Sequence, residues 1–112
     1  MEQQKFKKGR VRISNDIIKL IACEAAMDID GVTHLITENG TAMDKIDDNA
    51  MKSVDMQIIR NTVILDINIG VDYNSRINIV ARNVQKNIKD KIEIMTGLHV
   101  TTVNINVLEL EQ

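Results

Sequence analysis

The chain has 112 residues, 44% of them hydrophobic and 27% charged, with a formal net charge of −2. This length suits one domain, and the near-neutral charge does not favour nucleic-acid binding. Phe6 and Tyr73 are the only aromatic residues, so the core must be aliphatic and few faces exist on which a base could stack. Cys23 is the single cysteine, which excludes an internal disulfide. No run approaches the roughly 20 apolar residues of a spanning helix, so we expect a cytoplasmic protein.

The N-terminal region is polar and basic. Residues 1–9 are predicted to form a flexible basic tail ahead of a single domain over residues 10–112. The cations of this region are Lys5, Lys7, Lys8, Arg10 and Arg12. They are a candidate site for an anionic lipid surface or for phosphates, and a solvated tail is the alternative interpretation.

The first elements of the domain follow from short local signals. Residues 10–14 alternate arginines with Val11 and Ile13, which predicts a short edge strand. Ser14 suits the N-cap of a helix over residues 15–28. A strand over residues 32–37 follows. The next segment, residues 38–50, holds four acids and a glycine without a sustained period, which is typical of a surface loop.

The second part of the chain has stronger patterns. Alternating apolar runs at 54–58 and 63–71 are separated by a short Arg-Asn turn and predict an antiparallel hairpin. Seven apolar residues at separations of three and four then predict a long helix: Ile77, Val80, Ala81, Val84, Ile88, Ile92 and Met95. Gly97 suits the left-handed residue that ends this helix, and residues 102–107 alternate as a final strand.

These elements have the order β-α-β-β-β-α-β. One-sided helices and alternating strands require a single sheet with both helices on the same face. The predicted fold is therefore an α+β two-layer sandwich, with one mainly antiparallel sheet and two helices packed on one face.

The sequence offers no constellation of catalytic groups. The glycine patterns that cradle phosphates and the nucleophile elbow of hydrolases are missing, and one cysteine with two histidines cannot supply a zinc site. His34 and His99 each open a strand segment and could be neighbours in space, but we interpret them as ordinary strand or loop histidines. The acids of residues 38–50 do not fit the spacing of an EF-hand. We predict no enzymatic activity, no cofactor, no metal and no small-molecule substrate.

The first predicted helix carries two apolar stripes. Its expected core stripe consists of Ile17, Ile18, Ile21, Ala22, Ala25 and Ile29. Leu20, Cys23 and Met27 form a second stripe, separated from the first by Glu24 and Asp28. A helix that lies on a sheet buries one side only, so the second stripe needs cover from the neighbouring helix or from a partner. This stripe is a candidate surface for partner binding or self-association.

Three segments carry a resemblance to a known family. They are "GRVRISNDIIKLIACEAAMDIDGV", "VDYN" and "VARNVQKNIKDKIEIMTGLHVTTVNINV", which together run from Gly9 to Val107. This ordering resembles the alkaline shock protein family of bacterial envelope stress response proteins. Where that family has Tyr-Gly and then a proline, this chain has Tyr73-Asn74 and no proline, so Asn74 or Ser75 is expected to cap the long helix.

The resemblance implies a non-enzymatic protein that self-assembles or is held at the inner membrane face by a separate anchor protein. We therefore expect a scaffold or interaction protein in cell-envelope homeostasis, acting through contacts with protein partners. Its contact surfaces would be the open sheet face, an edge strand and the Leu20–Cys23–Met27 stripe. The alternative function is a nucleic-acid-binding regulatory module that uses the basic tail, whose binding would depend strongly on salt.

Overall fold

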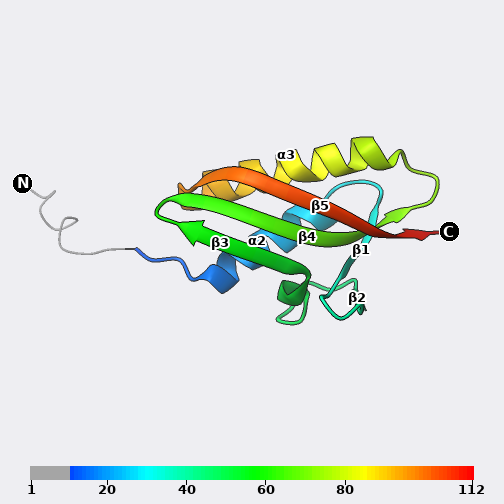
Figure 1. Ribbon diagram of the computed structural model, residues 1–112, viewed down its shortest axis with the longest axis horizontal. Helices are drawn as coiled ribbons and strands as arrows, with labels where there is room; N and C mark the ends of the chain where they lie inside the picture. The colour runs from blue at the N-terminus through cyan, green and yellow to red at the C-terminus, as the bar shows by residue number, and fades with distance from the viewer. Residues whose placement is uncertain (1–10) are drawn as a thin grey trace, which may run out of the picture.

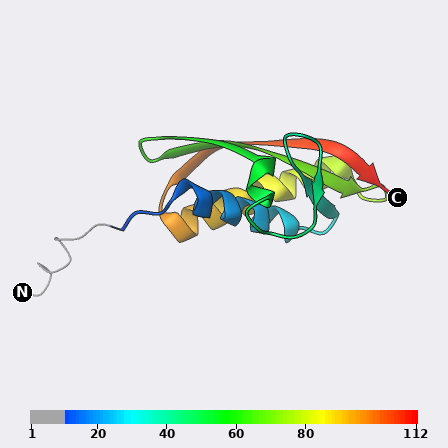
Figure 2. The same ribbon diagram turned by 90° about the horizontal axis from the view of Figure 1, so that it is seen from below.

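The computed structural model describes residues 11–112, which fold into two layers. The elements are α2 (Asn15–Met27), β1 (Val32–Ile36), β2 (Ala42–Met43), the 3-10 helix η1 (Ala50–Ser53), β3 (Val54–Ile59), β4 (Thr62–Asp72), α3 (Ile77–Thr96) and β5 (His99–Glu111). The strands form one sheet, and both helices lie on the same face of it (Figures 1 and 2). The predicted α+β sandwich is confirmed.

Strand β4 is the centre of the sheet. On one side it pairs with β5 along its whole length, and this pair is parallel. On its other side it pairs in antiparallel fashion with β3 and, further along, with β1, which in turn pairs with β2. The sheet is therefore mainly antiparallel, as predicted. The α3 crossover brings the chain back to the start of β4, which is why β5 runs parallel to that strand.

Most local sequence signals have their predicted roles. The Ser14 hydroxyl accepts a hydrogen bond from the Ile17 N–H at 3.2 Å, which makes it the N-cap of α2. Gly97 ends α3 with a φ of 77°. Beside it, the Thr96 hydroxyl donates to the Ile92 carbonyl and accepts from the Leu98 N–H. The "MTGLHV" segment is thus the structural joint between α3 and β5.

Two local predictions are wrong. Residues 11–14 do not form a strand: Val11 is 93% exposed, and no strand among residues 11–112 pairs with this segment. At the start of α3 the N-cap residue is Arg76, without a side-chain hydrogen bond, rather than Asn74 or Ser75. The N–H groups of those two residues instead donate to Asp72, whose side chain and carbonyl hold the turn before the helix.

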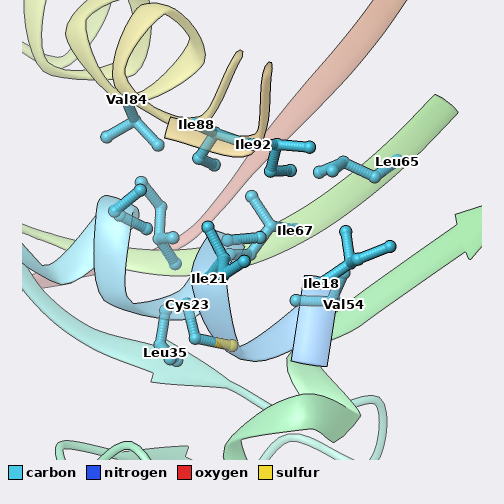
Figure 3. Packing of buried hydrophobic residues seen from close by; sticks show 14 of the residues in the cluster. Ile18, Ile21, Cys23, Leu35, Val54, Leu65, Ile67, Val84, Ile88 and Ile92 are labelled. Carbon is cyan, nitrogen blue, oxygen red and sulfur yellow. The ribbon is translucent and has the colours of Figure 1, made fainter. Parts of the chain in front are cut away.

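The core is aliphatic, as predicted, and lies between the helices and the inner face of the sheet (Figure 3). The inward side chains of β4 are all buried: Val63, Leu65, Ile67, Ile69 and Val71. Ile18 of α2 and Ile88 and Ile92 of α3 pack against them. The core stripe predicted for α2 is exposed at its first residue, Ile17, and the stripe predicted for α3 is exposed at both ends, Ile77 and Met95. These residues extend beyond the layer that the sheet covers.

Candidate interaction surface

Cys23 of the predicted second stripe is fully buried. Its thiol donates a hydrogen bond to the Ala50 carbonyl at 3.3 Å and lies 3.7 Å from the Ser53 hydroxyl. Burial raises the pKa of the Cys23 thiol, an effect that the Ser53 contact and the charge of Lys19 partly offset. A thiol held in its neutral form is a weak nucleophile, so the surroundings favour packing over reactivity.

Helix η1 covers this part of the stripe. The sequence suggested cover by the neighbouring helix or by a partner, so η1 is a third source of cover. The expected surface loop therefore ends in a helix that joins the core through Ala50 and Ser53. Leu20 and Met27 are half-buried on either side of Cys23. Their role as a partner surface stays a prediction.

The basic candidate site lies almost wholly beyond the described part of the chain. Lys5, Lys7, Lys8 and Arg10 are outside residues 11–112, and only Arg12 is described. Arg12 is exposed in the irregular segment that leads to the Ser14 cap.

His34 lies on the outer face of the sheet, above Gly70 of β4. Its Nε2 is 2.8 Å from Oε1 of Glu109, and its Nδ1 is 3.1 Å from Oε2 of Glu111. The Thr33 hydroxyl is 2.8 Å from the same Nδ1. Gly70 makes room for the ring, since a Cβ at that position would collide with it. We call His34, Glu109 and Glu111 the histidine clasp, because they tie the end of β5 to β1 across β4.

The two histidines are not neighbours. His34 pairs with Gly70, whereas His99 pairs with Thr62 at the opposite end of β4. Gly70 lies eight residue steps after Thr62 along the strand, which is roughly 26 Å at about 3.3 Å per step. The Nδ1 atom of His99 instead lies 3.3 Å from Oε2 of Glu93 on α3.

The acids of the 38–50 segment are exposed: Glu38, Asp44, Asp47 and Asp48. Asp47 has a local structural role, because its Oδ1 accepts hydrogen bonds from the N–H groups of Asn49 and Ala50. Within residues 11–112, no group of three or more His, Cys, Asp or Glu side chains is arranged to hold a metal ion. Over the same residues, neither helix has the length and apolar character needed to cross a bilayer.

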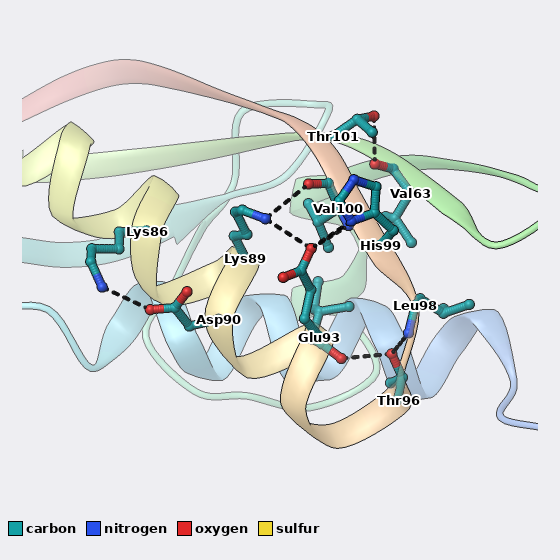
Figure 4. A network of polar contacts seen from close by, with 11 residues as sticks. Val63, Lys86, Lys89, Asp90, Glu93, Thr96, Leu98, His99, Val100 and Thr101 are labelled. Atoms are coloured by element: carbon teal, nitrogen blue, oxygen red, sulfur yellow. Dashed lines mark hydrogen bonds and ion pairs between the residues drawn. The ribbon is translucent and has the colours of Figure 1, made fainter.

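Strand β5 has one edge that faces away from β4, and side chains of α3 cap the first half of this edge (Figure 4). Glu93 Oε2 accepts from the Val100 N–H at 2.8 Å, and the Lys89 ammonium lies 3.5 Å from the Val100 carbonyl. Further along, the Gln85 amide donates to the Val103 carbonyl at 3.0 Å. These side chains satisfy backbone groups that point away from β4 and block this half of the edge to another strand.

Glu93 gives the cap a predictable pH dependence. Its hydrogen bond with Lys89, and then that with the Val100 N–H, hold the pKa of the Glu93 carboxyl below its ordinary 4.5. A lowered folded-state pKa means that the carboxylate stabilises the fold above pH 4.5 and that this contribution is lost as pH falls through the folded pKa. We expect Glu93→Gln to destabilise the protein at neutral pH.

Urea denaturation of the wild type and of Glu93→Gln at a series of pH values measures this effect. The difference between their free energies of unfolding should shrink as pH falls below 4.5. A difference that stays constant with pH would mean that the carboxylate charge plays no part in the cap.

The second half of the β5 edge is free. Within residues 11–112, no side chain forms a hydrogen bond to the β5 backbone between Asn104 and Leu110. Strand alternation directs the N–H and C=O groups of Ile105 and Val107 away from β4, like those of Val103. This stretch therefore presents unpaired backbone groups to which another strand could bind.

Exposed apolar side chains surround this free edge. Tyr73 is 55% exposed, Ile77 39%, Leu108 56% and Leu110 46%. A groove of about 250 Å³ runs between Ile77 and the last residues of β5. We call Tyr73, Ile77, Leu108 and Leu110 patch A. Its position beside an open strand edge makes it the best candidate for a contact surface.

Sequence reasoning named an edge strand but missed patch A. The sequence held one signal for it, a break in the strand alternation. Apolar residues fall on odd positions up to Val107 and then on even positions, at Leu108 and Leu110. The structure has a register shift there, opposite Ile69 and Gly70 of β4. The extra residue of a bulge changes which side chains share a face.

Known structures share this fold. One variant of the MamM CTD aligns with a TM-score of 0.53 at 14% identity, covering 85% of this chain and 95% of that one. Another aligns with a TM-score of 0.55 at 12% identity, over 88% of this chain and 100% of that one. At such low identity the likeness shows the fold alone.

Sequence relatives come from Bacillus subtilis (strain 168). The uncharacterized protein YloU is 31% identical over 105 residues, covering 90% of this chain and 88% of its own length. The uncharacterized protein YqhY is 27% identical over 115 residues, covering 99% of this chain and 84% of its own length. Residues 3–112 match the alkaline shock protein 23 family, which is described as having a cell envelope-related function. The chain belongs to this family.

Proposed function

We propose that the protein is a non-enzymatic scaffold in the cell envelope, and that it binds a protein partner through patch A and the free half of the β5 edge. The observation that carries this proposal is the contrast along β5, where α3 caps the first half and leaves the second half open. A strand from a partner can form backbone hydrogen bonds there while its side chains cover patch A.

The family's envelope-related description supports a place of action at the cell envelope. We propose that the protein is cytoplasmic and is held at the inner membrane face by a membrane anchor protein. Leu20 and Met27 would supply a second contact, since both are half-buried and therefore partly exposed to a partner. The basic residues from Lys5 to Arg12 would add contact with an anionic surface on the strength of their charge.

Cross-linking in the native host tests the proposal. The full chain would be purified from membrane and cytosolic fractions after cross-linking, and the attached proteins identified by mass spectrometry. A Leu108→Glu/Leu110→Glu double variant should recover the partner at least about tenfold less, because two carboxylates would be desolvated in the contact.

Ile46→Glu is the matched control. Ile46 is also an exposed aliphatic residue, at 39%, but it lies in the loop before η1 and outside patch A. Its variant should recover the partner as the wild type does. Equal recovery by the wild type and the patch A double variant would overturn the proposed contact surface.

A further inference from the structure

A groove lies between α3 and the capped first half of β5. Its volume is about 510 Å³. Three cations line it from α3, namely Arg82, Lys86 and Lys89, and two hydroxyl groups line it from β5, those of Thr101 and Thr102. None of the residues that line the groove in the described part of the chain is an acid. The groove therefore has an excess of positive charge.

A bulge in β5 determines which backbone groups face this groove. Thr101 has no pairing partner in β4, so it is the extra residue of the bulge. Because of it, Val100 and Val103 both direct their N–H and C=O groups away from β4 and toward α3, although they are three residues apart in sequence. The bulge also leaves the consecutive side chains of Thr101 and Thr102 exposed.

The Val100 position shows how this edge binds an oxyanion. Oε2 of Glu93 accepts a hydrogen bond from the Val100 N–H at 2.8 Å and another from the Lys89 ammonium at 2.8 Å (Figure 4). The same ammonium lies 3.5 Å from the Val100 carbonyl. One carboxylate oxygen is thus held by a backbone donor and a cation together, in charge-assisted hydrogen bonds.

The Val103 position has the backbone donor but no carboxylate. Gln85, four residues before Lys89 on α3, donates to the Val103 carbonyl at 3.0 Å. The residue four before Glu93 is Lys89 itself, and an ammonium group cannot accept a hydrogen bond. Within residues 11–112, no side chain accepts from the Val103 N–H. This donor therefore faces a cationic groove in which the chain supplies no anion.

Two of the cations are available to an added anion. Arg82 is exposed and forms no ion pair among residues 11–112. Lys86 lies 2.9 Å from Asp90, but the two side chains are 78% and 46% exposed. Exposed pairs of this kind contribute little to stability, so a ligand of higher charge can compete for Lys86.

We infer that this groove binds a phosphate monoester, with one phosphate oxygen accepting from the Val103 N–H and the others contacting Arg82 and Lys86. A phosphate monoester carries a charge of about −1.5 to −2 at pH 7 and three acceptor oxygens, which suits several cations and a backbone donor. The planar guanidinium of Arg82 can bind two of these oxygens at once. No aromatic residue lines the groove, so nothing there stacks on a base. The phosphate group itself is therefore what the site recognises.

This site differs from the proposed partner contact. The groove uses the capped half of the β5 edge, whereas patch A adjoins the free half. The inference goes beyond the proposed function, and each of the two can fail without the other.

Nuclear magnetic resonance on the full chain, labelled with ¹⁵N, tests the inference. Glycerol 3-phosphate would be added at an ionic strength held constant with sodium chloride, because salt screens exposed charges. The amide signals of Val103 and Thr102 should shift in a saturable manner, while that of Leu108 in patch A should not. Dimethyl phosphate, a diester with one negative charge, should bind more weakly, and equal affinity for it would overturn the assignment to a monoester.

A double variant removes the two available cations. Arg82→Gln/Lys86→Gln should bind glycerol 3-phosphate at least about tenfold more weakly, since two charge-assisted contacts are lost. Lys91→Gln is the matched control, because Lys91 is also on α3 but lies 3.5 Å from Asp28 and does not line the groove. It should bind as the wild type does. Circular dichroism should show unchanged folding in both variants, and undiminished binding by the double variant would overturn the inference.

A phosphate monoester also forms the headgroup of phosphatidic acid, so flotation with vesicles identifies the source of the ligand. The vesicles would contain phosphatidylcholine with and without phosphatidic acid. Weaker flotation of the double variant than of the wild type assigns the site to the lipid headgroup. Equal flotation together with binding of glycerol 3-phosphate assigns it to a free phosphate ester. Equal flotation without a saturable shift of Val103 would overturn the inference.

Discussion

Replacing Gly70 with valine is expected to destabilise the protein by about 3 kcal/mol, as overpacking of a closed site does. Valine is a better strand residue than glycine, so propensity alone would favour the change. The cost arises because the ring of His34 occupies the space in which the new side chain would lie. Displacing the ring also breaks the histidine clasp with Glu109 and Glu111. Urea denaturation of both proteins measures the difference in free energy of unfolding.

The matched control removes the ring itself. In a His34→Ala background the space above Gly70 is empty, so Gly70→Val should cost much less there than in the wild type. The difference between the two costs is the coupling energy of the pair. An equal cost in both backgrounds would show that some other contact of β4 excludes the valine.

Replacing Ile88 with alanine is the second change with a large expected effect. Ile88 is fully buried between α3 and the sheet, so the truncation loses apolar burial and leaves a cavity. Such changes cost about 2–5 kcal/mol, and we expect about 3–4 kcal/mol because Ile88 lies in the main core cluster, whose other side chains hold the site open. Thermal or urea denaturation of the purified variant measures the loss.

Ile94→Ala is the control for this change. It removes the same atoms from the same helix, but Ile94 is 82% exposed. Its cost should stay within about 0.5 kcal/mol, as is usual for surface positions. Similar costs for Ile88→Ala and Ile94→Ala would mean that α3 packs on the sheet through a different face.

The sequence predicted those features that depend on neighbouring residues. A cap such as Ser14, a left-handed Gly97 and the stripe that includes Ile88 each act over one or two helical turns, so their patterns can be read locally. The same holds for the hairpin with Arg60 in its turn, at a φ of 58°. Two alternating residues, Val11 and Ile13, were too few to specify a strand.

The contact surfaces could be predicted only in part. The Leu20–Cys23–Met27 stripe was visible as an excess of apolar residues, but the sequence could not show that η1 covers Cys23. The capping of β5 by Gln85 depends on the packing angle of α3, which local patterns do not encode. Patch A was hidden because the bulge near Leu108 changes the phase of the strand.

By itself, then, the sequence determined the fold class, the aliphatic core and most element boundaries, because periodicity and caps act between residues close along the chain. Only the tertiary structure decided that His34 meets Glu109 and Glu111, and that the exposed side chains of Ile77 and of Leu108 and Leu110 lie along one groove. These features join residues as far apart in sequence as His34 and Glu111. Their proximity depends on how the layers pack, and no local pattern records it.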